Sequence, residues 1–193
     1  MILAPCIKFA FVGGCLLVAL ISGFWCRDKK DWLCLVGGLV FTVLSDAYLV
    51  MEQEHLSGVA VFCFVHVFYI FRAVEISKKI FAAFFGFVAL WSVLLVLKSV
   101  IIFAMLYAFL FAVNIFVNYK TRRPKLNYFL VMAGLILFAL CDINVFLFNL
   151  PQYLGVPDFF PSAFALIWIF YLPSQIFLAV SAIRYRGIRN SFE

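Results

Sequence analysis

Two aspartates lie deep inside long apolar stretches of this sequence. Asp46 precedes the end of its stretch at Met51 by five residues, and Asp142 precedes the end of its stretch at Asn149 by seven. At 1.5 Å per residue of α-helix, each carboxylate lies roughly 8–10 Å from the end of its stretch. An ionisable group placed there is costly and commonly faces a cavity or a partner, which favours a functional role for both aspartates.

The chemistry open to such a pair is proton transfer. Two carboxylates in one low-dielectric pocket cannot both ionise easily, so together they hold a proton at neutral pH. One group can then donate a proton while the other accepts one, as general acid–base catalysis requires. The other interpretation is structural, with helix-packing hydrogen bonds to Ser45 or Asn144. We favour catalysis and expect Asp46 and Asp142 to face each other across a polar cavity.

Other polar side chains share helix faces inside apolar stretches. His66 and Tyr69 are three residues apart and therefore lie on one face of a helix. A lone histidine is more often a structural hydrogen-bond partner than a site residue, and both roles stay open for His66. Tyr171 and Gln175 share a face of the last stretch, and Pro173 between them predicts a kink that opens a cavity.

Lys8 lies near one end of the first apolar stretch. We expect it to pair with a carboxylate or a lipid phosphate, or to extend towards the membrane interface. Metal chemistry is disfavoured, because the sequence has only two histidines and neither an HxxxH nor an HExxH pattern. A serine-hydrolase GxSxG motif is absent as well. The sequence therefore predicts a site without a metal ion or an organic cofactor.

The elements that must position these residues are membrane-spanning helices. Hydrophobic residues make up 67% of the 193 residues and charged residues only 12%, so a soluble domain would expose too much apolar surface. The net charge of +6 comes from short basic clusters between apolar runs. Such clusters indicate membrane topology and argue against nucleic acid as a partner.

Seven apolar runs are each about long enough to cross the hydrocarbon core. They cover residues 5–25, 32–51, 57–73, 80–97, 100–118, 127–149 and 162–183. Helices satisfy their own backbone in lipid, and the polar alternation of a β-barrel is absent. The sequence predicts an all-α membrane protein, a bundle of about seven transmembrane helices in one domain over residues 1–193. The fourth and fifth helices must form a tight hairpin at Lys98.

The basic residues predict the orientation of the bundle. Nearly all 15 of them fall on one side if there are seven spans. These are Arg27, Lys29, Lys30, Arg72, Lys78, Lys79, Lys120, Arg122, Arg123, Lys125, Arg184, Arg186 and Arg189. By the positive-inside rule, the C-terminus is expected in the cytoplasm and the N-terminus outside. A bacterial inner membrane is the expected location for so compact a chain.

Residues 38–46 and 134–142 read alike. Both segments begin with Gly-Leu, have Leu at the seventh position and end on Asp. A repeat at this separation predicts three helices, a linker helix and three more helices, related by an axis along the membrane normal. Two leucine-rich helices can share such a pattern by chance, but the glycine and aspartate at identical spacing favour the repeat.

Six features follow one another along the chain. They are Lys8, Leu44-Ser45-Asp46, Gly58, His66-x-x-Tyr69, Leu140-Cys141-Asp142 and Tyr171-x-x-x-Gln175. In type and spacing they resemble the YhhN family of lysoplasmalogenase-like membrane proteins. The resemblance covers most of the chain, although residues 76–125 match only in being hydrophobic, and Cys141 stands where the family usually has serine.

This resemblance implies a reaction and a substrate. The reaction is hydrolysis of the vinyl ether bond of lysoplasmalogens, which are lysophospholipids, to a fatty aldehyde and a glycerophospho-alcohol. Asp46 and Asp142 would be catalytic. Substrate and water would be positioned by Lys8, His66, Tyr69, Tyr171 and Gln175. The alternative function is a small transporter or proton-coupled carrier, since paired carboxylates within a membrane can relay protons.

Overall fold

A computed structural model describes residues 3–26, 28–52, 55–75, 77–155 and 160–183. Within these residues, seven helices are long and apolar enough to cross a membrane, and the only β pairing is an isolated bridge between Cys26 and Ile183. This confirms the prediction of an all-α membrane protein. The elements are α1 (Leu3–Ser22), η1 (Gly23–Trp25), α2 (Lys29–Asp46), η2 (Ala47–Glu52), α3 (His55–Ala73), α4 (Lys78–Leu97), α5 (Val100–Lys120), α6 (Lys125–Leu154) and α7 (Ala163–Val180).

The chain forms two compact units, which are described separately. The first unit, Met1–Thr121 with Ala182–Glu193, holds α1 to α5, and the second, Arg122–Ser181, holds α6 and α7. The single transmembrane domain and the three-one-three repeat stay predictions. The last basic cluster, Arg184, Arg186 and Arg189, lies outside the described residues.

Polar caps begin three helices of the first unit. The carboxylate of Asp28 accepts a hydrogen bond from the backbone N–H of Lys30 at 2.9 Å. Ser77 and Ser99 accept in the same way from amides in the first turns of α4 and α5. Because a cap satisfies amides that the helix itself leaves free, α2 and α4 begin two or three residues ahead of the apolar runs that predicted them.

The predicted hairpin between the fourth and fifth spans is confirmed. Helix α4 ends at Leu97 and α5 begins at Val100. Lys98 takes a left-handed conformation with φ of 48°, and its N–H bonds to the carbonyl of Leu95 at 3.2 Å. A left-handed residue commonly closes a helix, and here it lets the chain reverse within two residues.

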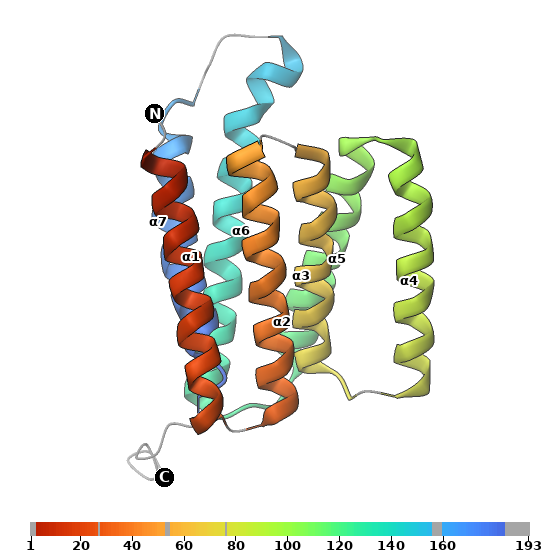
Figure 1. Ribbon diagram of the computed structural model, residues 1–193, viewed down its shortest axis with the longest axis vertical. Helices are drawn as coiled ribbons and strands as arrows, with labels where there is room; N and C mark the ends of the chain where they lie inside the picture. The colour runs from red at the N-terminus through yellow and green to blue at the C-terminus, as the bar shows by residue number, and fades with distance from the viewer. Residues whose placement is uncertain (1–2, 27, 53–54, 76, 156–159, 184–193) are drawn as a thin grey trace. The chain divides into compact units, whose positions relative to one another are not determined.

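Helices α1, α2 and α3 lie side by side in the first unit, and α3 also packs on α5 (Figure 1). The contact between α2 and α3 is close because two glycines of α2 meet aromatic rings of α3. A Cβ atom on Gly37 would lie 2.6 Å from the ring of Phe68, and one on Gly38 would overlap the ring of Tyr69. The indole N–H of Trp32 fixes α2 to α1 by donating to the carbonyl of Ala19 at 2.7 Å.

The second unit is an antiparallel pair of helices. Helix α6 is 30 residues long, or about 45 Å, and extends beyond the predicted run 127–149 at both ends. It closes at Gly155, whose φ of 65° suits glycine. Gly134 allows close packing with α7, since a Cβ atom there would lie 3.2 Å from the carbonyl oxygen of Ser174.

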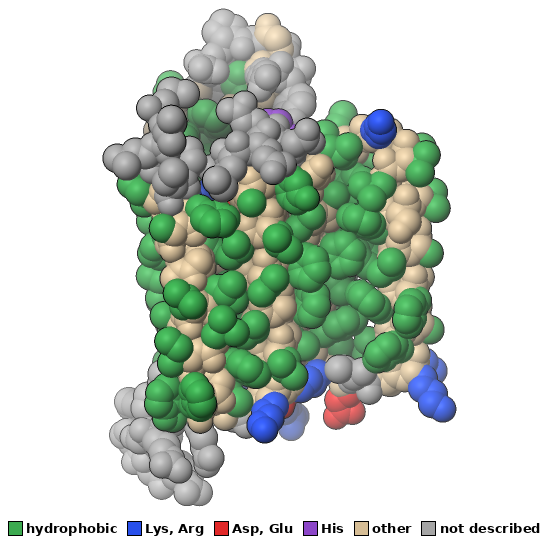
Figure 2. Space-filling view, viewed as in Figure 1, with side chains coloured by type: hydrophobic (Ala, Val, Ile, Leu, Met, Phe, Trp, Pro, Cys, Tyr) green, Lys and Arg blue, Asp and Glu red, His purple; other side chains and the backbone are tan. Residues whose placement is uncertain are grey.

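Hydrophobic side chains cover most of α2, α3 and α4 on the face shown in Figure 2, and Lys and Arg gather at the helix ends. Many large hydrophobic residues are exposed on these helices, including Leu33, Phe85 and Val96. A surface of this kind is stable in lipid and unstable in water. The distribution agrees with a multi-pass membrane protein.

Candidate active site

Lys8 and Asp46 form an ion pair between α1 and α2. The Nζ atom of Lys8 lies 2.7 Å from Oδ1 of Asp46. The Asp46 side chain is 1% exposed and that of Lys8 is 15% exposed. The sequence left a carboxylate, a lipid phosphate and the membrane interface open for Lys8, and the structure shows a carboxylate. In so buried a place, attraction between the two charges is screened far less than at a protein surface.

The backbone changes its winding directly after Asp46. Asp46 is the last residue of α2, and η2 continues from Ala47 as a π-helix. The hydroxyl of Ser45 donates to the carbonyl of Gly58 on α3 at 2.7 Å. Leu49 packs where a side chain on residue 58 would have to be, so Gly58 is required for this close approach. Wider turns of this kind are frequent at functional sites.

Burial makes the position of Asp46 unfavourable without a cation, because the carboxylate is removed from water. The ammonium group of Lys8 offsets this cost, and the ion pair therefore fixes the position of the carboxylate.

His66 lies against α5. Its ring stacks on Phe111 with 4.4 Å between centroids, and its Nδ1 is 3.2 Å from Nδ2 of Asn114. Asn118 continues this cluster by donating from Nδ2 to Oδ1 of Asn114 at 2.7 Å. All three polar residues are buried. Their hydrogen bonds link α3 to α5, because buried polar side chains in an apolar bundle need partners across the helix interface.

The hydrogen bonds of Asn114 bear on the tautomer of His66. Oδ1 of Asn114 accepts from Asn118, and the amide nitrogen of Asn114 faces His66. An amide nitrogen can only donate, so this contact matches a neutral ring with its proton on Nε2. A role for His66 in the candidate active site stays a prediction.

Asn114→Leu is expected to lower the free energy of unfolding by about 1–2 kcal/mol, since it removes hydrogen bonds to two buried groups. The measurement is unfolding by SDS titration of the detergent-solubilised protein. Asn149→Leu is the matched control, because the Asn149 side chain bonds only to Val145 in its own helix among the described contacts. Equal stability of the two variants would contradict a structural role for Asn114.

Tyr69 lies against α2. Its ring packs over Gly38, and the guanidinium carbon of Arg72 is 5.9 Å from the centre of that ring. Arg72 also bonds to both carboxylate oxygens of Asp31, at 3.0 and 3.1 Å. A bidentate pair of this kind is both strong and directional. It locks the last turn of α3 to the first turn of α2, and the role of Tyr69 in the site stays a prediction.

The remaining candidate residues lie in the second unit. Asp142 is half-buried on α6, one helical turn beyond Phe138, whose ring contacts that of Tyr171 on α7 at 6.0 Å. Tyr171 and Gln175 are buried one turn apart on α7. Asp142, Tyr171 and Gln175 therefore lie on two helices packed against each other. Whether Asp142 faces Asp46 stays a prediction, because the two aspartates belong to different units.

The structure also locates the two groups named as structural partners of the aspartates. Ser45 donates to Gly58, and the amide of Asn144 donates to the carbonyl of Leu140 in its own helix at 2.7 Å. Sequence analysis did not single out Asn114 or Asn118. Their spacing of four residues in an apolar run was the available signal, since buried amides on one helix face need partners across a helix interface.

Two further observations concern the cysteines and the possible metal ligands. The cysteines with described side chains form no disulfide bond. Within the described residues, no group of three or more histidine, cysteine, aspartate or glutamate side chains could hold a metal ion.

Comparison with known proteins identifies the family. The model of the YhhN family matches residues 5–182, nearly the whole chain. The chain belongs to the YhhN family. No curated protein and no solved structure gives a significant match. The matched residues contain both candidate aspartates, the ion pair of Lys8 with Asp46, and all seven membrane-spanning helices of the described structure.

Proposed function

We propose that this YhhN protein hydrolyses the vinyl ether bond of lysoplasmalogens, releasing a fatty aldehyde and a glycerophospho-alcohol. The observation that carries the proposal is the buried ion pair between Lys8 and Asp46. It holds a carboxylate at a fixed position within an apolar bundle, and electrostatic stabilisation of a developing positive charge requires such a preorganised group. Membership of the YhhN family supports the same reaction.

The chemistry needs an acid, a base and water. A carboxylic acid protonates the β-carbon of the C=C–O group, and the double bond becomes an oxocarbenium ion centred on the α-carbon. Water adds to the α-carbon while a carboxylate takes its proton, which gives a hemiacetal. The hemiacetal then releases the aldehyde and returns a proton to the departing glycerol oxygen. Atoms and charges balance without any further reactant.

The ion pair assigns the two carboxyl groups different roles in this proposal. Lys8 stabilises the negative charge of Asp46, so Asp46 is the carboxylate that stabilises the oxocarbenium ion and activates water. Asp142 is then the acid that protonates the β-carbon. Two carboxyl groups held in different environments commonly divide acid and base roles in this way.

The substrate is expected to enter from the membrane. A lysolipid can move sideways between helices while its single chain stays in hydrocarbon. Tyr171 and Gln175, buried on α7, are proposed to position water and the glycerol backbone. We also propose that the helix ends with the basic clusters face the cytoplasm. Asp46, at the opposite end of α2 from Lys29, then lies in the outer half of the membrane.

The proposal is tested by incubating the purified protein in detergent with a lysoplasmalogen and measuring aldehyde. Aldehyde release is expected without any ion gradient. The matched control is the saturated alkyl ether of the same headgroup and chain length, which has no double bond to protonate and is expected to stay intact. Absence of aldehyde from the vinyl ether would contradict the proposal and favour a carrier, which has no chemical product in detergent.

A further inference from the structure

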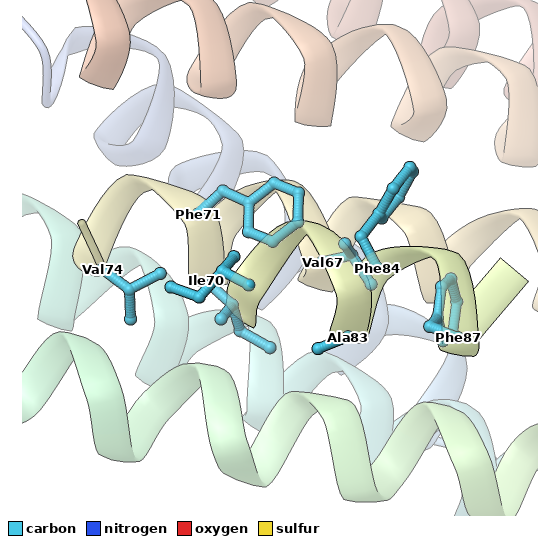
Figure 3. Close-up of a pocket in the computed structure, with 8 residues that line it drawn as sticks. Val67, Ile70, Phe71, Val74, Ala83, Phe84 and Phe87 are labelled. Atoms are coloured by element: carbon cyan, nitrogen blue, oxygen red, sulfur yellow. The ribbon is translucent and has the colours of Figure 1, made fainter. Parts of the chain in front are cut away.

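An apolar crevice separates α3 from α4 near their basic ends (Figure 3). It is open to the surface of the bundle and has a volume of about 220 Å³. Its walls are side chains of α3 from Val67 onwards, Val74 just after α3, and side chains between Ile80 and Phe87 on α4, and all of them are hydrophobic. Empty space of this size next to lipid is costly, because the lining atoms lose their dispersion contacts.

The crevice is remote from the candidate active site. On α3, Gly58 meets Ser45 beside Asp46, and the crevice begins nine residues later at Val67. Nine residues of α-helix span about 14 Å. The crevice is therefore separate from the site of the proposed hydrolysis.

Aromatic contacts close the inner end of the crevice. The indole N–H of Trp91 on α4 donates to the carbonyl of Ala60 on α3 at 2.9 Å. The ring of Phe64 contacts those of Phe87 and Trp91 at 5.3 and 5.1 Å between centroids. Helix α4 has no buried residue, so it is attached to the bundle mainly by such contacts. A linear chain can enter between the helices from the other end.

The open end of the crevice is positively charged. Lys78 and Lys79 are exposed in the first turn of α4. Lys30 of α2 donates from Nζ to the carbonyl of Val74, one of the lining residues. Glu75 is the one carboxylate in the described part of the α3–α4 connection, residues 74, 75 and 77. The carboxylates nearby are those of Glu75 and of Asp28 and Asp31 at the start of α2, and Asp31 is paired with Arg72. The ammonium groups of Lys30, Lys78 and Lys79 outnumber the other two carboxylates, which favours an anionic ligand at this end.

We propose that the crevice binds an anionic glycerophospholipid of the surrounding bilayer. One acyl chain fills the space between α3 and α4, and the phosphate lies among Lys30, Lys78 and Lys79. The lysines suit the head group, because basic pockets between membrane helices recognise anionic head groups. The apolar walls suit the acyl chain, because burial of a hydrocarbon chain is favourable. The bound lipid completes the packing of α4 on α3.

The test is native mass spectrometry of the detergent-solubilised protein with equal amounts of phosphatidylglycerol and phosphatidylcholine. The wild type is expected to retain one phosphatidylglycerol in preference to phosphatidylcholine. Joint substitution of Lys78→Gln and Lys79→Gln is expected to reduce this preference, by roughly fivefold for each lysine. Lys98→Gln, at the other end of α4, is the control and is expected to leave the preference unchanged.

A second pair of variants tests the chain site. Ala83 lines the crevice and its neighbour Ala82 does not. Ala83→Phe is expected to fill the space and remove the retained lipid, whereas Ala82→Phe is expected to keep it. Equal retention of both lipids by the wild type, or retention unaffected by Ala83→Phe, would overturn the proposal. Since neither readout involves aldehyde release, either result is independent of the proposed hydrolysis.

Discussion

Asp46→Asn and Asp142→Asn are each expected to abolish aldehyde release, with a loss of at least about 10²–10⁴-fold, the range for one acid–base group. Asparagine keeps the size and hydrogen bonding of the side chain but cannot transfer the proton. The variant with both substitutions is expected to be no slower than either single variant, because groups that act as one unit do not contribute additively.

The measurement is the rate of aldehyde release from a lysoplasmalogen by purified variants of equal folded content. Asp28→Asn is the matched control, because asparagine also caps a helix and Asp28 caps α2 at the end away from Asp46. Activity in both single variants would contradict the catalytic pair. Losses that multiply in the double variant would show two independent sites.

Lys8→Met is expected to destabilise the protein strongly, by about 3–5 kcal/mol, because it leaves the carboxylate of Asp46 buried without a cation. Asp46 is 1% exposed and cannot reach water by a small movement. Asp46→Asn is expected to cost less, since the longer Lys8 side chain can extend towards the interface. Lys8→Met is also expected to reduce aldehyde release, because the carboxylate loses the group that fixes it.

Combination of the two substitutions separates the charge effect from packing. A variant with both Lys8→Met and Asp46→Asn buries no unpaired charge, so it is expected to be more stable than Lys8→Met alone while staying inactive. The free energy of unfolding, measured by SDS titration, gives the coupling energy of the pair. Additive effects of the two substitutions on stability would show that the ion pair contributes nothing to the fold.

Hydrophobicity was sufficient to predict the seven helices, because a span in lipid must be long, apolar and helical. It did not predict their ends. The second run extended to Met51, but α2 ends at Asp46 and η2 follows with π winding. Hydropathy does not distinguish α from π winding, and it does not report that Leu49 packs over Gly58 of α3.

The candidate site was predictable in part. A buried cation and a buried carboxylate stabilise each other, and Lys8 does pair with Asp46. Sequence spacing placed His66 and Tyr69 on one helix face, yet His66 packs against α5 and Tyr69 against α2. A single face of α3 is wide enough to contact two neighbours, so shared periodicity does not imply a shared partner. The spacing of Asn114 and Asn118 placed both on one helix face, but their partners on α3 were identified only in the structure.

The central claim is that a carboxylic acid of this protein protonates the vinyl ether. The most direct measurement is the reaction of the wild type with a lysoplasmalogen in D₂O, with the aldehyde reduced at once by borohydride and examined by mass spectrometry. The account predicts one deuterium on C2 of the product, because the acid exchanges its proton with solvent before it protonates the β-carbon. A product with only hydrogen at C2 would contradict the account.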